Sequence, residues 1–241
     1  IMIKDCRKDT DVVVLAGGRG TRVASVLKNK PKILAPLGKR LFIDLLLNWL
    51  EYYGAKRIIF SLGFLSESII RHLESIKSKS IEFKIVVEER PMGTAGAIRN
   101  VRNQIETDPI LVVNGDSFVN ADLCNFVNFH LSQDNKTSII CTRVTDVSRY
   151  GSVTVSSNKK VISFIEKKNV SGRGYISTGV YLFNRTIIDD ISNGGPSLEK
   201  DYLSNQDSET IGAMVGDFEF LDIGTPETLS KAPVILGRFF K

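Results

Sequence analysis

The chain has 241 residues, 42% hydrophobic and 24% charged, enough apolar material to bury a full core, and we predict one soluble domain. No run approaches the roughly 20 unbroken apolar residues of a membrane helix, and the amino-terminal residues alternate charged with apolar side chains, so we expect a cytoplasmic protein with no membrane partner. The formal charge of +5 is scattered among acids without a recognisable nucleic-acid module, which favours small phosphorylated substrates over nucleic acid.

The first half of the chain alternates β-branched apolar runs with amphipathic stretches, the pattern of a parallel sheet covered by helices. The expected strands are Asp11–Ala16, Arg57–Leu62, Ile81–Glu88 and Ile110–Asn114. Helices are expected at Leu41–Tyr53, which Gly54 ends, and from Ser66 onward, where apolar residues recur at helical spacing. Ligands bind at the carboxyl ends of the strands in such sheets, so we look for the site directly after them.

From about Thr137 the strands become shorter and polar turns separate them, so we expect mixed pairing there. The expected strands are Ser138–Val144, Ser152–Ser156, Val161–Ile165, Gly179–Phe183, Thr210–Val215 and Glu219–Leu221. Short helices are expected at Thr186–Ile191 and Ser197–Leu203, and a last helix begins at Thr225–Pro226. Since no repeat or interdomain linker interrupts the chain, we predict a single domain over residues 1–241.

The three cysteines, Cys6, Cys124 and Cys141, are far apart in the sequence and show no C-x-x-C spacing. Neither a disulfide framework nor a zinc site is therefore indicated. We expect all three cysteines to be reduced.

The first expected strand runs directly into a glycine-rich loop, which reads Leu15-Ala16-Gly17-Gly18-Arg19-Gly20-Thr21-Arg22. Glycines leave backbone N–H groups free to face an anion, so the loop indicates a phosphate cradle. The dinucleotide fingerprint is excluded because it requires a glycine where Val23 stands, and no G-x-x-x-x-G-K-[ST] stretch occurs in the chain. A turn that needs positive φ explains one or two of these glycines, but not three beside an arginine.

A proline-stiffened segment carries cations back toward the same strand end. It reads Lys30-Pro31-Lys32-Ile33-Leu34-Ala35-Pro36-Leu37-Gly38-Lys39. Together the two segments resemble the signature of the sugar-1-phosphate nucleotidyltransferases, L-A-G-G-x-G-T-R followed by K-P-K or P-K-P and then P-x-x-G-K. The resemblance implies an α/β fold, Rossmann-like, with three layers (α/β/α) and a mixed, mostly parallel sheet. Ile33 and Arg40 depart from the residues that this family usually carries at those places.

By this resemblance, Arg22 and Lys32 hold a nucleoside triphosphate and neutralise charge on the phosphorus under attack. This role is physically reasonable because a polyphosphate repels an incoming phosphate, and cations fixed around the α-phosphate lower that barrier. The residues implied to be catalytic are Arg22, Lys32 and Asp116. The resemblance also implies a nucleotide-binding half at about residues 11–136 and a sugar-binding half at about 137–241.

A turn after the third expected strand opens a helix with small residues, Glu88-Glu89-Arg90-Pro91-Met92-Gly93-Thr94-Ala95-Gly96-Ala97. It resembles the family's P-L-G-T-A/G-G-A element, which holds the nucleobase and ribose. A carboxylate at Glu88 can accept two hydrogen bonds from guanine, which favours GTP, although uridylyl relatives also carry Glu there and an exposed Glu88–Arg90 pair is the plain alternative. The residues implied for nucleotide binding are Leu15, Ala16, Gly17, Gly18, Gly20, Thr21, Glu88, Gly93, Thr94, Asn114 and Gly115.

Two acidic residues follow apolar strands at widely separated places in the sequence. One strand runs into Asn114-Gly115-Asp116, and another into Asp222-Ile223-Gly224-Thr225-Pro226. A lone acid at the end of a buried strand is costly without a partner. The family carries N/L-G-D and D-x-G-T-P elements here, whose aspartates bind Mg²⁺, so the resemblance implies that Asp116 and Asp222 are the metal ligands. Alone, either aspartate would more often cap a helix or form a turn.

The later half of the chain carries three further family elements in the same order, Y-G, F-x-E-K and N/S-x-G-x-Y. The resemblance implies that Glu166 grips sugar hydroxyls and that Lys167 holds the sugar phosphate. Exposed charge is the plain alternative for this pair, and helix capping is the alternative for Ser197 and Glu199. The residues implied for sugar binding are Tyr150, Gly151, Glu166, Lys167, Thr178, Gly179, Ser197 and Glu199.

Among the members of the family, the chain most resembles the heptose 1-phosphate guanylyltransferases of bacterial surface-polysaccharide pathways. The resemblance implies transfer of GMP from GTP to D-glycero-D-manno-heptose 1-phosphate, with release of pyrophosphate and formation of a nucleotide sugar for capsule or lipopolysaccharide. The alternatives are a mannose 1-phosphate guanylyltransferase, an amino-sugar 1-phosphate uridylyltransferase and a catalytically silent regulatory subunit. The presence of every expected cation and acid argues against the silent subunit. For the oligomeric state, the working hypothesis is a homodimer.

Overall fold

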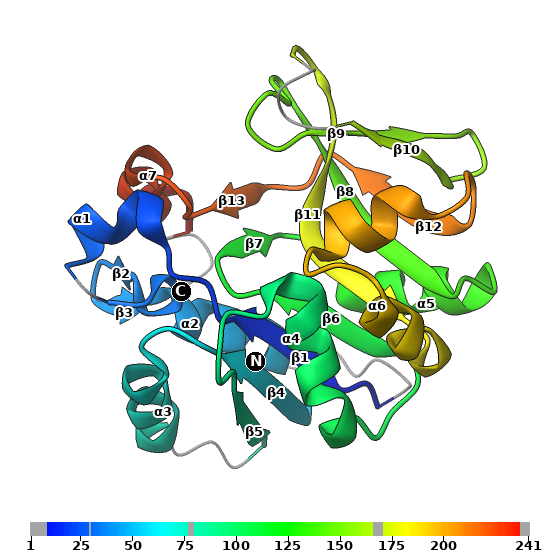
Figure 1. The fold of residues 1–241 in the computed structure, drawn as a ribbon. Helices are drawn as coiled ribbons and strands as arrows, with labels where there is room; N and C mark the ends of the chain where they lie inside the picture. Colours follow the sequence, from blue (N-terminus) through cyan, green and yellow to red (C-terminus); the bar gives the residue numbers. More distant parts are fainter. Residues whose placement is uncertain (1–8, 29, 77–79, 166–170, 237–241) are drawn as a thin grey trace.

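The computed structural model describes residues 9–28, 30–76, 80–165 and 171–236 (Figure 1). Its strands are β1 (Val12–Ala16), β2 (Pro36–Leu37), β3 (Arg40–Leu41), β4 (Arg57–Leu62), β5 (Glu82–Val87), β6 (Ile110–Asn114), β7 (Ser117–Val119), β8 (Thr137–Val144), β9 (Ser152–Val155), β10 (Val161–Ile165), β11 (Gly174–Phe183), β12 (Ile211–Gly216) and β13 (Phe220–Asp222). Its α-helices are α1 (Ala24–Leu27), α2 (Phe42–Tyr52), α3 (Ser66–Ser75), α4 (Gly93–Val101), α5 (Leu123–Ser132), α6 (Ile188–Asn193) and α7 (Pro226–Leu236). Short helical turns are η1 (Thr21–Val23), η2 (Lys32–Leu34), η3 (Arg102–Gln104), η5 (Arg185–Ile187), η6 (Leu198–Tyr202) and η7 (Leu203–Asn205).

Strand β1 lies between β4 and β6, and all three run parallel, with β5 parallel on the far side of β4. The register places Ala16 beside Leu62, and Leu15 beside Asn114. The carboxyl ends of these strands therefore lie together, and the segments that follow them share one edge of the sheet. The parallel first half predicted from the sequence is confirmed.

The second half of the chain extends the same sheet with mixed pairing, as predicted. Strand β11 runs antiparallel to β6, β8 and β9, whereas β12 runs parallel to β8. β11 begins at Gly174, earlier than the predicted Gly179, because residues 174–177 continue the pairing with β8. The β8 register shifts between Ser177 and Tyr181, where Gly179 has a positive φ of 78°. Such a bulge bends the strand and exposes its backbone on one side.

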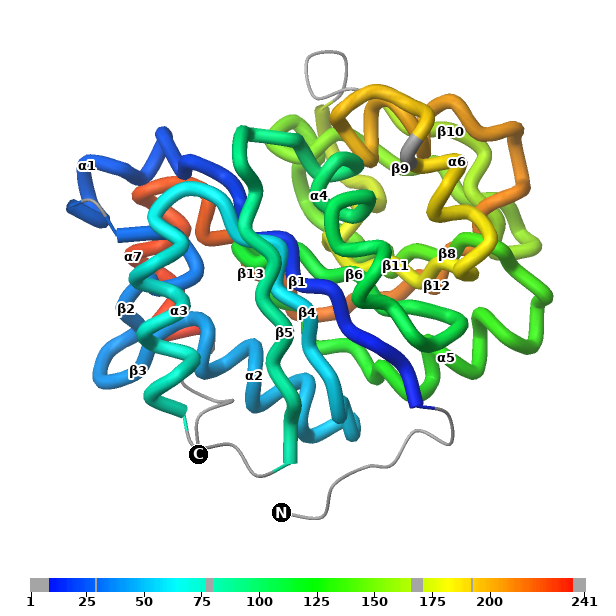
Figure 2. Tube along the Cα trace, turned by 60° about the horizontal axis from the view of Figure 1, so that its bottom comes forward, coloured from blue at the N-terminus to red at the C-terminus, as the bar shows by residue number. Residues whose placement is uncertain are grey.

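Two apolar clusters form the core, one on each face of the sheet. Alternate residues of β1 point to opposite faces, so Val12 and Val14 join one cluster and Val13 and Leu15 the other. Helices α2, α3, α5 and α7 cover the first face, and α4 and α6 cover the second (Figure 2). The predicted three-layer arrangement is confirmed.

Strand β7 was not predicted, and it is only three residues long. It pairs antiparallel with β13, which places Ser117 opposite Asp222. This two-stranded sheet is separate from the central sheet. Because β7 follows β6 of the central sheet and β13 precedes α7, the pairing connects β6 to the start of α7. The pairing brings the two predicted metal-binding aspartates to the same place in the fold.

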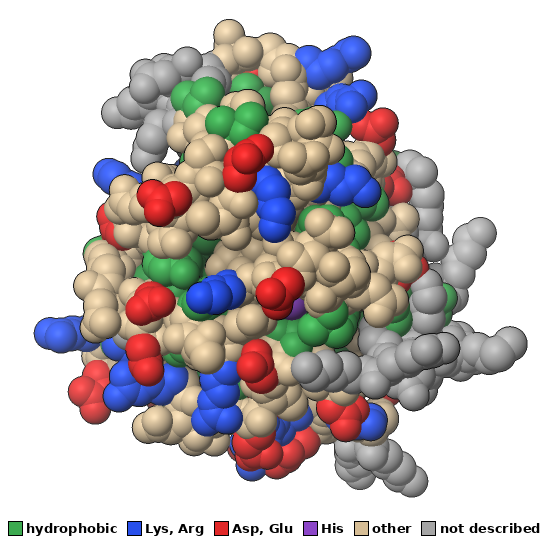
Figure 3. Space-filling view, turned by 90° about the vertical axis from the view of Figure 1, so that its right-hand side faces the viewer, with side chains coloured by type: hydrophobic (Ala, Val, Ile, Leu, Met, Phe, Trp, Pro, Cys, Tyr) green, Lys and Arg blue, Asp and Glu red, His purple; other side chains and the backbone are tan. Residues whose placement is uncertain are grey.

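The surface agrees with the scattered charge of the sequence. On the face shown in Figure 3, Lys and Arg side chains are interspersed with Asp and Glu among the described residues. Within the described part of the chain, no helix combines the length and apolar character that crossing a bilayer requires.

The cysteines depart from the sequence-based expectation. Cys141 is free and buried, and burial raises the pKa of its thiol. Cys124 takes part in a disulfide bond, so the expectation that every cysteine is reduced is wrong for this residue. Spacing along the chain reveals local motifs but not which thiols the fold brings together.

Asp11, at the amino-terminal end of β1, is expected to be the strongest polar support of the sheet away from the site. It is 2% exposed and accepts hydrogen bonds from Arg57 Nε (2.9 Å) and from the amides of Glu106 (2.7 Å) and Thr107 (3.1 Å). Burial raises the pKa of Asp11, but these hydrogen bonds outweigh burial and lower the pKa overall. The contribution to stability is therefore complete above the ordinary pKa of 3.8 and is lost as the pH falls further.

We expect Asp11→Asn to lower the free energy of unfolding at pH 7 by about 3 kcal/mol, because Arg57, whose side chain is 11% exposed, loses one of its two carboxylate partners. Glu106 remains as the other partner of Arg57. Urea denaturation measures the change. The control is Asp9→Asn, since Asp9 pairs with Lys56 at the surface and both side chains are 67% exposed. An equal effect of the two substitutions would contradict the role given to Asp11.

Candidate active site

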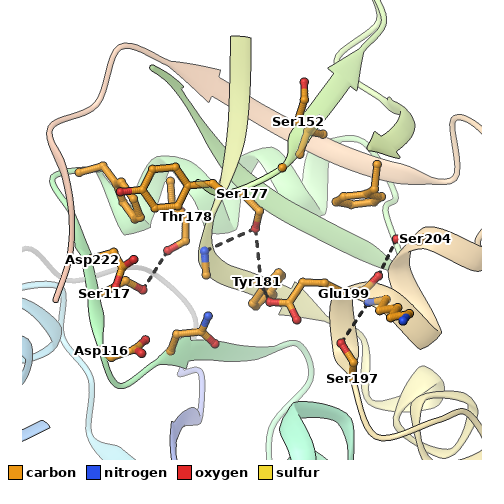
Figure 4. Close-up of a pocket in the computed structure, with 18 of the residues that line it drawn as sticks. Asp116, Ser117, Ser152, Ser177, Thr178, Tyr181, Ser197, Glu199, Ser204 and Asp222 are labelled. Carbon is orange, nitrogen blue, oxygen red and sulfur yellow. Dashed lines mark hydrogen bonds between the residues drawn. The ribbon is translucent and has the colours of Figure 1, made fainter. Parts of the chain in front are cut away.

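Two adjoining pockets lie at the carboxyl ends of the parallel strands, and they share Asn114 and Asp116. The glycine-loop pocket, of about 340 Å³, is lined by residues 15–19, 31–33, 91–94 and 114–116, with Glu88 and Ala97. The β11 pocket, of about 430 Å³, is lined by residues from β6, β7, β9, β10, β11, η6 and β13 (Figure 4). One pocket thus belongs to the first half of the chain, and the other mostly to the second.

The glycine-rich loop is shaped by close packing at Gly17. A Cβ atom on Gly17 would collide with the Glu88 carboxylate, and one on Gly63 would lie 2.6 Å from the Gly17 carbonyl oxygen. At Gly20, φ is 59°, and an added Cβ would lie 2.8 Å from Lys32 Cγ. An added Cβ on Gly18 would meet nothing within 4 Å, so the loop presents an open backbone surface to the pocket there.

Glu88 lies in the wall of the glycine-loop pocket. Its Oε1 accepts a hydrogen bond from Ser61 Oγ (3.3 Å), and its Oε2 accepts one from the Met92 amide (3.1 Å). Because an ionised carboxylate offers about four acceptor positions, capacity remains for a ligand. The structure describes both Glu88 and Arg90, and no ion pair joins them. The alternative of an exposed Glu88–Arg90 ion pair is therefore not observed.

The junction of the pockets gathers the predicted catalytic side chains. Lys32 Nζ lies 2.8 Å from Asp116 Oδ2, and Lys32 lines the glycine-loop pocket. Arg22 lines the β11 pocket, so the two cations approach Asp116 from different sides. Among the described residues, Arg22 makes no ion pair and remains available to an anion.

Asp222 and Asp116 lie on the same side of the β11 pocket (Figure 4). Burial raises the pKa of Asp222, and the negative charge of Asp116 raises it further. Beside them, Asn114 Oδ1 is buried and has no hydrogen-bond partner in the described part of the chain. Two mutually repelling carboxylates and an unsatisfied oxygen are an arrangement that a bound cation or donor would complete.

The β11 pocket collects the described members of the predicted sugar site, which are Tyr150, Gly151, Thr178, Gly179, Ser197 and Glu199. Glu199 is held by the Tyr181 hydroxyl, which donates to Oε1 (2.6 Å). Burial, and then the Glu199 carboxylate, raise the pKa of Tyr181, so this hydroxyl stays protonated and donates. The second carboxylate oxygen of Glu199 has no hydrogen-bond partner among the described residues and can accept from a ligand.

The η6 turn that carries Ser197 and Glu199 is fastened to the first half of the chain. The Leu198 amide donates to Thr94 Oγ1 (2.7 Å), at the start of α4. Ser197 also caps its own turn, accepting from the Lys200 amide (3.1 Å), so the helix-capping alternative is found in addition to the pocket position. The hydrogen bond from Leu198 to Thr94 therefore connects the η6 turn, in the wall of the β11 pocket, to the start of α4, in the wall of the glycine-loop pocket.

Most predicted site residues line one of the two pockets, with four exceptions. Gly20 and Thr21 belong to the glycine-rich loop but line neither pocket. Glu166 and Lys167 lie outside the described residues.

Several pocket residues were not predicted. Arg19 occupies the variable place of the glycine-rich motif, and Tyr181 stands inside the N/S-x-G-x-Y element, so a closer look at those motifs could have found them. Pro91, Met92, Phe164 and Ser177 also stand inside the quoted motifs, although none was named as a site residue. No such motif marks some of the remaining pocket residues, among them Ser152, Lys200 and Ser204 in the β11 pocket.

Comparison with known proteins finds matches along nearly the whole chain. Residues 11–236 match the family described as Nucleotidyl transferase. The D-glycero-alpha-D-manno-heptose 1-phosphate guanylyltransferase of Campylobacter jejuni is 31% identical over 216 residues, which cover 89% of this chain and 95% of the relative. The mannose-1-phosphate guanylyltransferase of Mycobacterium tuberculosis is 29% identical over 233 residues, or 95% of this chain and 65% of that longer relative.

A solved structure has the same fold. The crystal structure of HddC from Yersinia pseudotuberculosis shares 35% identity with this chain, at a TM-score of 0.84, and the match covers 96% of this chain and 100% of that one. A second structure of HddC, complexed with GMP-PN, also shares 35% identity, at a TM-score of 0.83 and with the same coverage.

Proposed function

Because this chain belongs to the nucleotidyl transferase family, we propose that it transfers GMP from GTP to D-glycero-D-manno-heptose 1-phosphate, releasing pyrophosphate and forming a GDP-activated heptose. The observation that carries the proposal is the junction of two pockets at Asn114 and Asp116. One pocket has the glycine-rich loop of a phosphate cradle, and the other is lined by hydroxyl and carboxylate groups suited to a sugar. The similarity to a heptose 1-phosphate guanylyltransferase, and to HddC solved with GMP-PN, supports heptose and guanine.

In the proposed reaction, an ionised oxygen of the sugar 1-phosphate attacks the α-phosphorus of GTP as the bond to the β-phosphate breaks. No general base is required, because the attacking phosphate is already ionised near neutral pH. Lys32, from the glycine-loop side, and Arg22, from the β11 side, offset the negative charge that gathers around the α-phosphate. Pyrophosphate leaves on the side of the glycine-rich loop.

We further propose Mg²⁺ as the cofactor, held by Asp116 and Asp222. The carboxylate pair and the nearby Asn114 oxygen are hard oxygen donors, which Mg²⁺ prefers. Among the described residues, no group of three or more His, Cys, Asp or Glu side chains gathers. Two carboxylates with substrate phosphates and water are a usual set for this ion, so the residues fit it. When bound, Mg²⁺ would offset charge on the reacting phosphates.

We expect Glu88→Gln to raise KM for GTP by about tenfold with little change in kcat, because one acceptor for the guanine edge becomes a donor. Steady-state pyrophosphate release at saturating sugar 1-phosphate measures the change. Glu89→Gln is the matched control, since Glu89 is the exposed neighbour and should leave KM unchanged. An unchanged KM in Glu88→Gln would remove Glu88 from the base site.

A grid of nucleoside triphosphates and sugar 1-phosphates, with pyrophosphate release in Mg²⁺ as the readout, tests the proposed function. Turnover with GTP and the heptose phosphate alone is the expected result. Turnover with mannose 1-phosphate would favour the second candidate, which the mycobacterial relative supports. Turnover with UTP and an N-acetylated hexosamine phosphate would overturn the base and the sugar. If no substrate pair releases pyrophosphate while the protein still binds nucleotide, the catalytically silent regulatory subunit would be favoured.

Three further parts of the sequence-based prediction remain proposals. We propose that the product serves capsule or lipopolysaccharide synthesis, that the reaction takes place in the cytoplasm, where GTP is supplied, and that the protein acts as a homodimer. The division into a nucleotide-binding half (11–136) and a sugar-binding half (137–241) also stays a prediction, which the allocation of the two pockets supports.

A further inference from the structure

Arg149 lies beside the proposed reaction centre, and none of the roles above uses it. Its guanidinium carbon lies 5.1 Å from the centroid of the Tyr150 ring, which is a wall of the β11 pocket. Its Nη2 lies 4.0 Å from Asp222 Oδ2 and donates a hydrogen bond to Thr225 Oγ1 (3.4 Å). One side chain thus contacts the sugar-pocket wall, a proposed metal ligand and the start of α7.

The loop that carries Arg149 is fixed by its own hydrogen bonds. Ser148 donates from its amide (3.0 Å) and from its hydroxyl (2.8 Å) to the two carboxylate oxygens of Asp146. The amides of Tyr150 (2.9 Å) and Gly151 (3.0 Å) both donate to the carbonyl oxygen of Val147. These bonds set the backbone at Arg149, and the contacts with Tyr150, Thr225 and Asp222 orient its exposed side chain.

The charges around the two proposed metal ligands are arranged in pairs. Asp116 has Lys32 at 2.8 Å, and Asp222 has Arg149 at 4.0 Å. The negative charges of the two carboxylates are offset by the positive charges of Lys32 and Arg149, and Arg22 in the β11 pocket adds a further positive charge. A divalent cation that approaches without nucleotide therefore meets no net negative charge from these side chains. A bound triphosphate would supply the missing negative charge.

We propose that Arg149 is a positioning residue of the reaction centre, which orients the Tyr150 ring, offsets the charge of Asp222 and makes cation binding depend on bound nucleotide. The proposal rests on the proposed function of the same site. The stack on Tyr150 is a cation–π contact, which stabilises the ring orientation. The 4.0 Å separation from Asp222 leaves that carboxylate unbonded to the guanidinium, so the arginine offsets its charge without occupying its oxygens.

Arg149→Met tests both parts, because methionine keeps much of the length and removes the charge and the planar group. Without nucleotide, we expect Mn²⁺, followed by electron paramagnetic resonance, to bind this variant about threefold more tightly than the unmodified protein, since one screened repulsive charge is gone. At the same time, KM for the sugar 1-phosphate should rise about fivefold, because the Tyr150 ring loses the guanidinium over its face and, of these two contacts, keeps only the edge contact with Phe220, at 5.6 Å between centroids. Damage to the fold would weaken the binding of both Mn²⁺ and the sugar 1-phosphate. Tighter Mn²⁺ binding together with a higher KM for the sugar 1-phosphate therefore identifies the proposed role.

Two further variants complete the test. Arg149→Lys keeps the charge and loses the planar stack, so Mn²⁺ affinity should stay unchanged while KM for the sugar 1-phosphate rises. Arg143→Met is the matched control, because Arg143 also stacks on a tyrosine, Tyr175 (5.2 Å), beside an acid, Asp217 (3.6 Å), but lines neither pocket. Both quantities should be unchanged in this control.

The proposal is overturned if Arg149→Met binds Mn²⁺ no more tightly than the unmodified protein, or if KM for the sugar 1-phosphate does not rise in an active enzyme. The Mn²⁺ titration needs no turnover. An unmodified protein that releases no pyrophosphate with any sugar phosphate would count against the proposed function, and the Mn²⁺ comparison would still decide the role of Arg149.

Discussion

Replacing Lys32 with methionine is expected to lower kcat/KM for pyrophosphate release by about 10³-fold, the loss seen when a fixed charge or donor is removed from a reaction centre. Lys32 lies at the junction of the two pockets, with its ammonium group 2.8 Å from Asp116. The side chain is only 16% exposed, so its charge acts through little solvent. No other described lysine lines the glycine-loop pocket, so none is placed to take over its role.

The choice of methionine matters, because the stem of Lys32 also packs against Gly20. Lys32→Ala would leave a gap under the glycine-rich loop, whereas Lys32→Met keeps the stem and removes only the charge. Lys39→Met, at an exposed position outside both pockets, is the control and should retain full activity. Activity of Lys32→Met within tenfold of the control, at normal GTP binding, would refute the catalytic role of Lys32.

Regular strands with strong local patterns were predictable from the sequence. β4 was predicted at its observed bounds, Arg57–Leu62, because a β-branched and aromatic run stands between charged Lys56 and Gly63. β11 was predicted too short, because Gly179 interrupts the strand pattern, and residues 174–177 continue the strand by pairing with β8. Tertiary pairing overrides local preference in such segments, and the sequence pattern does not reveal it.

The candidate site was predictable where a motif marked it. The glycine-rich loop and both aspartates carry motifs, and the fold brings them together. What joins Asp222 to Asp116 is the pairing of β7 with β13, between short segments far apart in the chain. Arg149 directly precedes the Y-G motif, but no role was predicted for it, and its contacts depend on a loop fold that only the structure reveals. Long-range contacts between single side chains leave no periodic signal in a sequence.

Asp222→Asn is expected to lower kcat by about 10³-fold, because the proposed Mg²⁺ loses one of its two carboxylate ligands and with it several kcal/mol of charge stabilisation. The substitution should be mild for the fold, since an asparagine Oδ1 can still accept the hydrogen bond from the Gly224 amide. Pyrophosphate release at saturating GTP and sugar phosphate measures the loss. Retained activity at ordinary Mg²⁺ concentrations would remove Asp222 from the metal site.

The stability of the same variant separates a ligand role from a structural one. Burial, and then Asp116, raise the pKa of Asp222, so the folded protein holds the proton more tightly than the unfolded chain does. Above the ordinary pKa of 3.8, the ionised carboxylate therefore destabilises the fold, and this cost is complete once the pH exceeds the raised folded pKa.

In EDTA at neutral pH, Asp222→Asn should melt at the same temperature as the unmodified protein or a few degrees higher. With Mg²⁺ and GTP present, the order should reverse, because only the unmodified protein gains the full stabilisation of the bound pair. A variant that melts lower in both conditions would instead show that Asp222 supports the β13 turn.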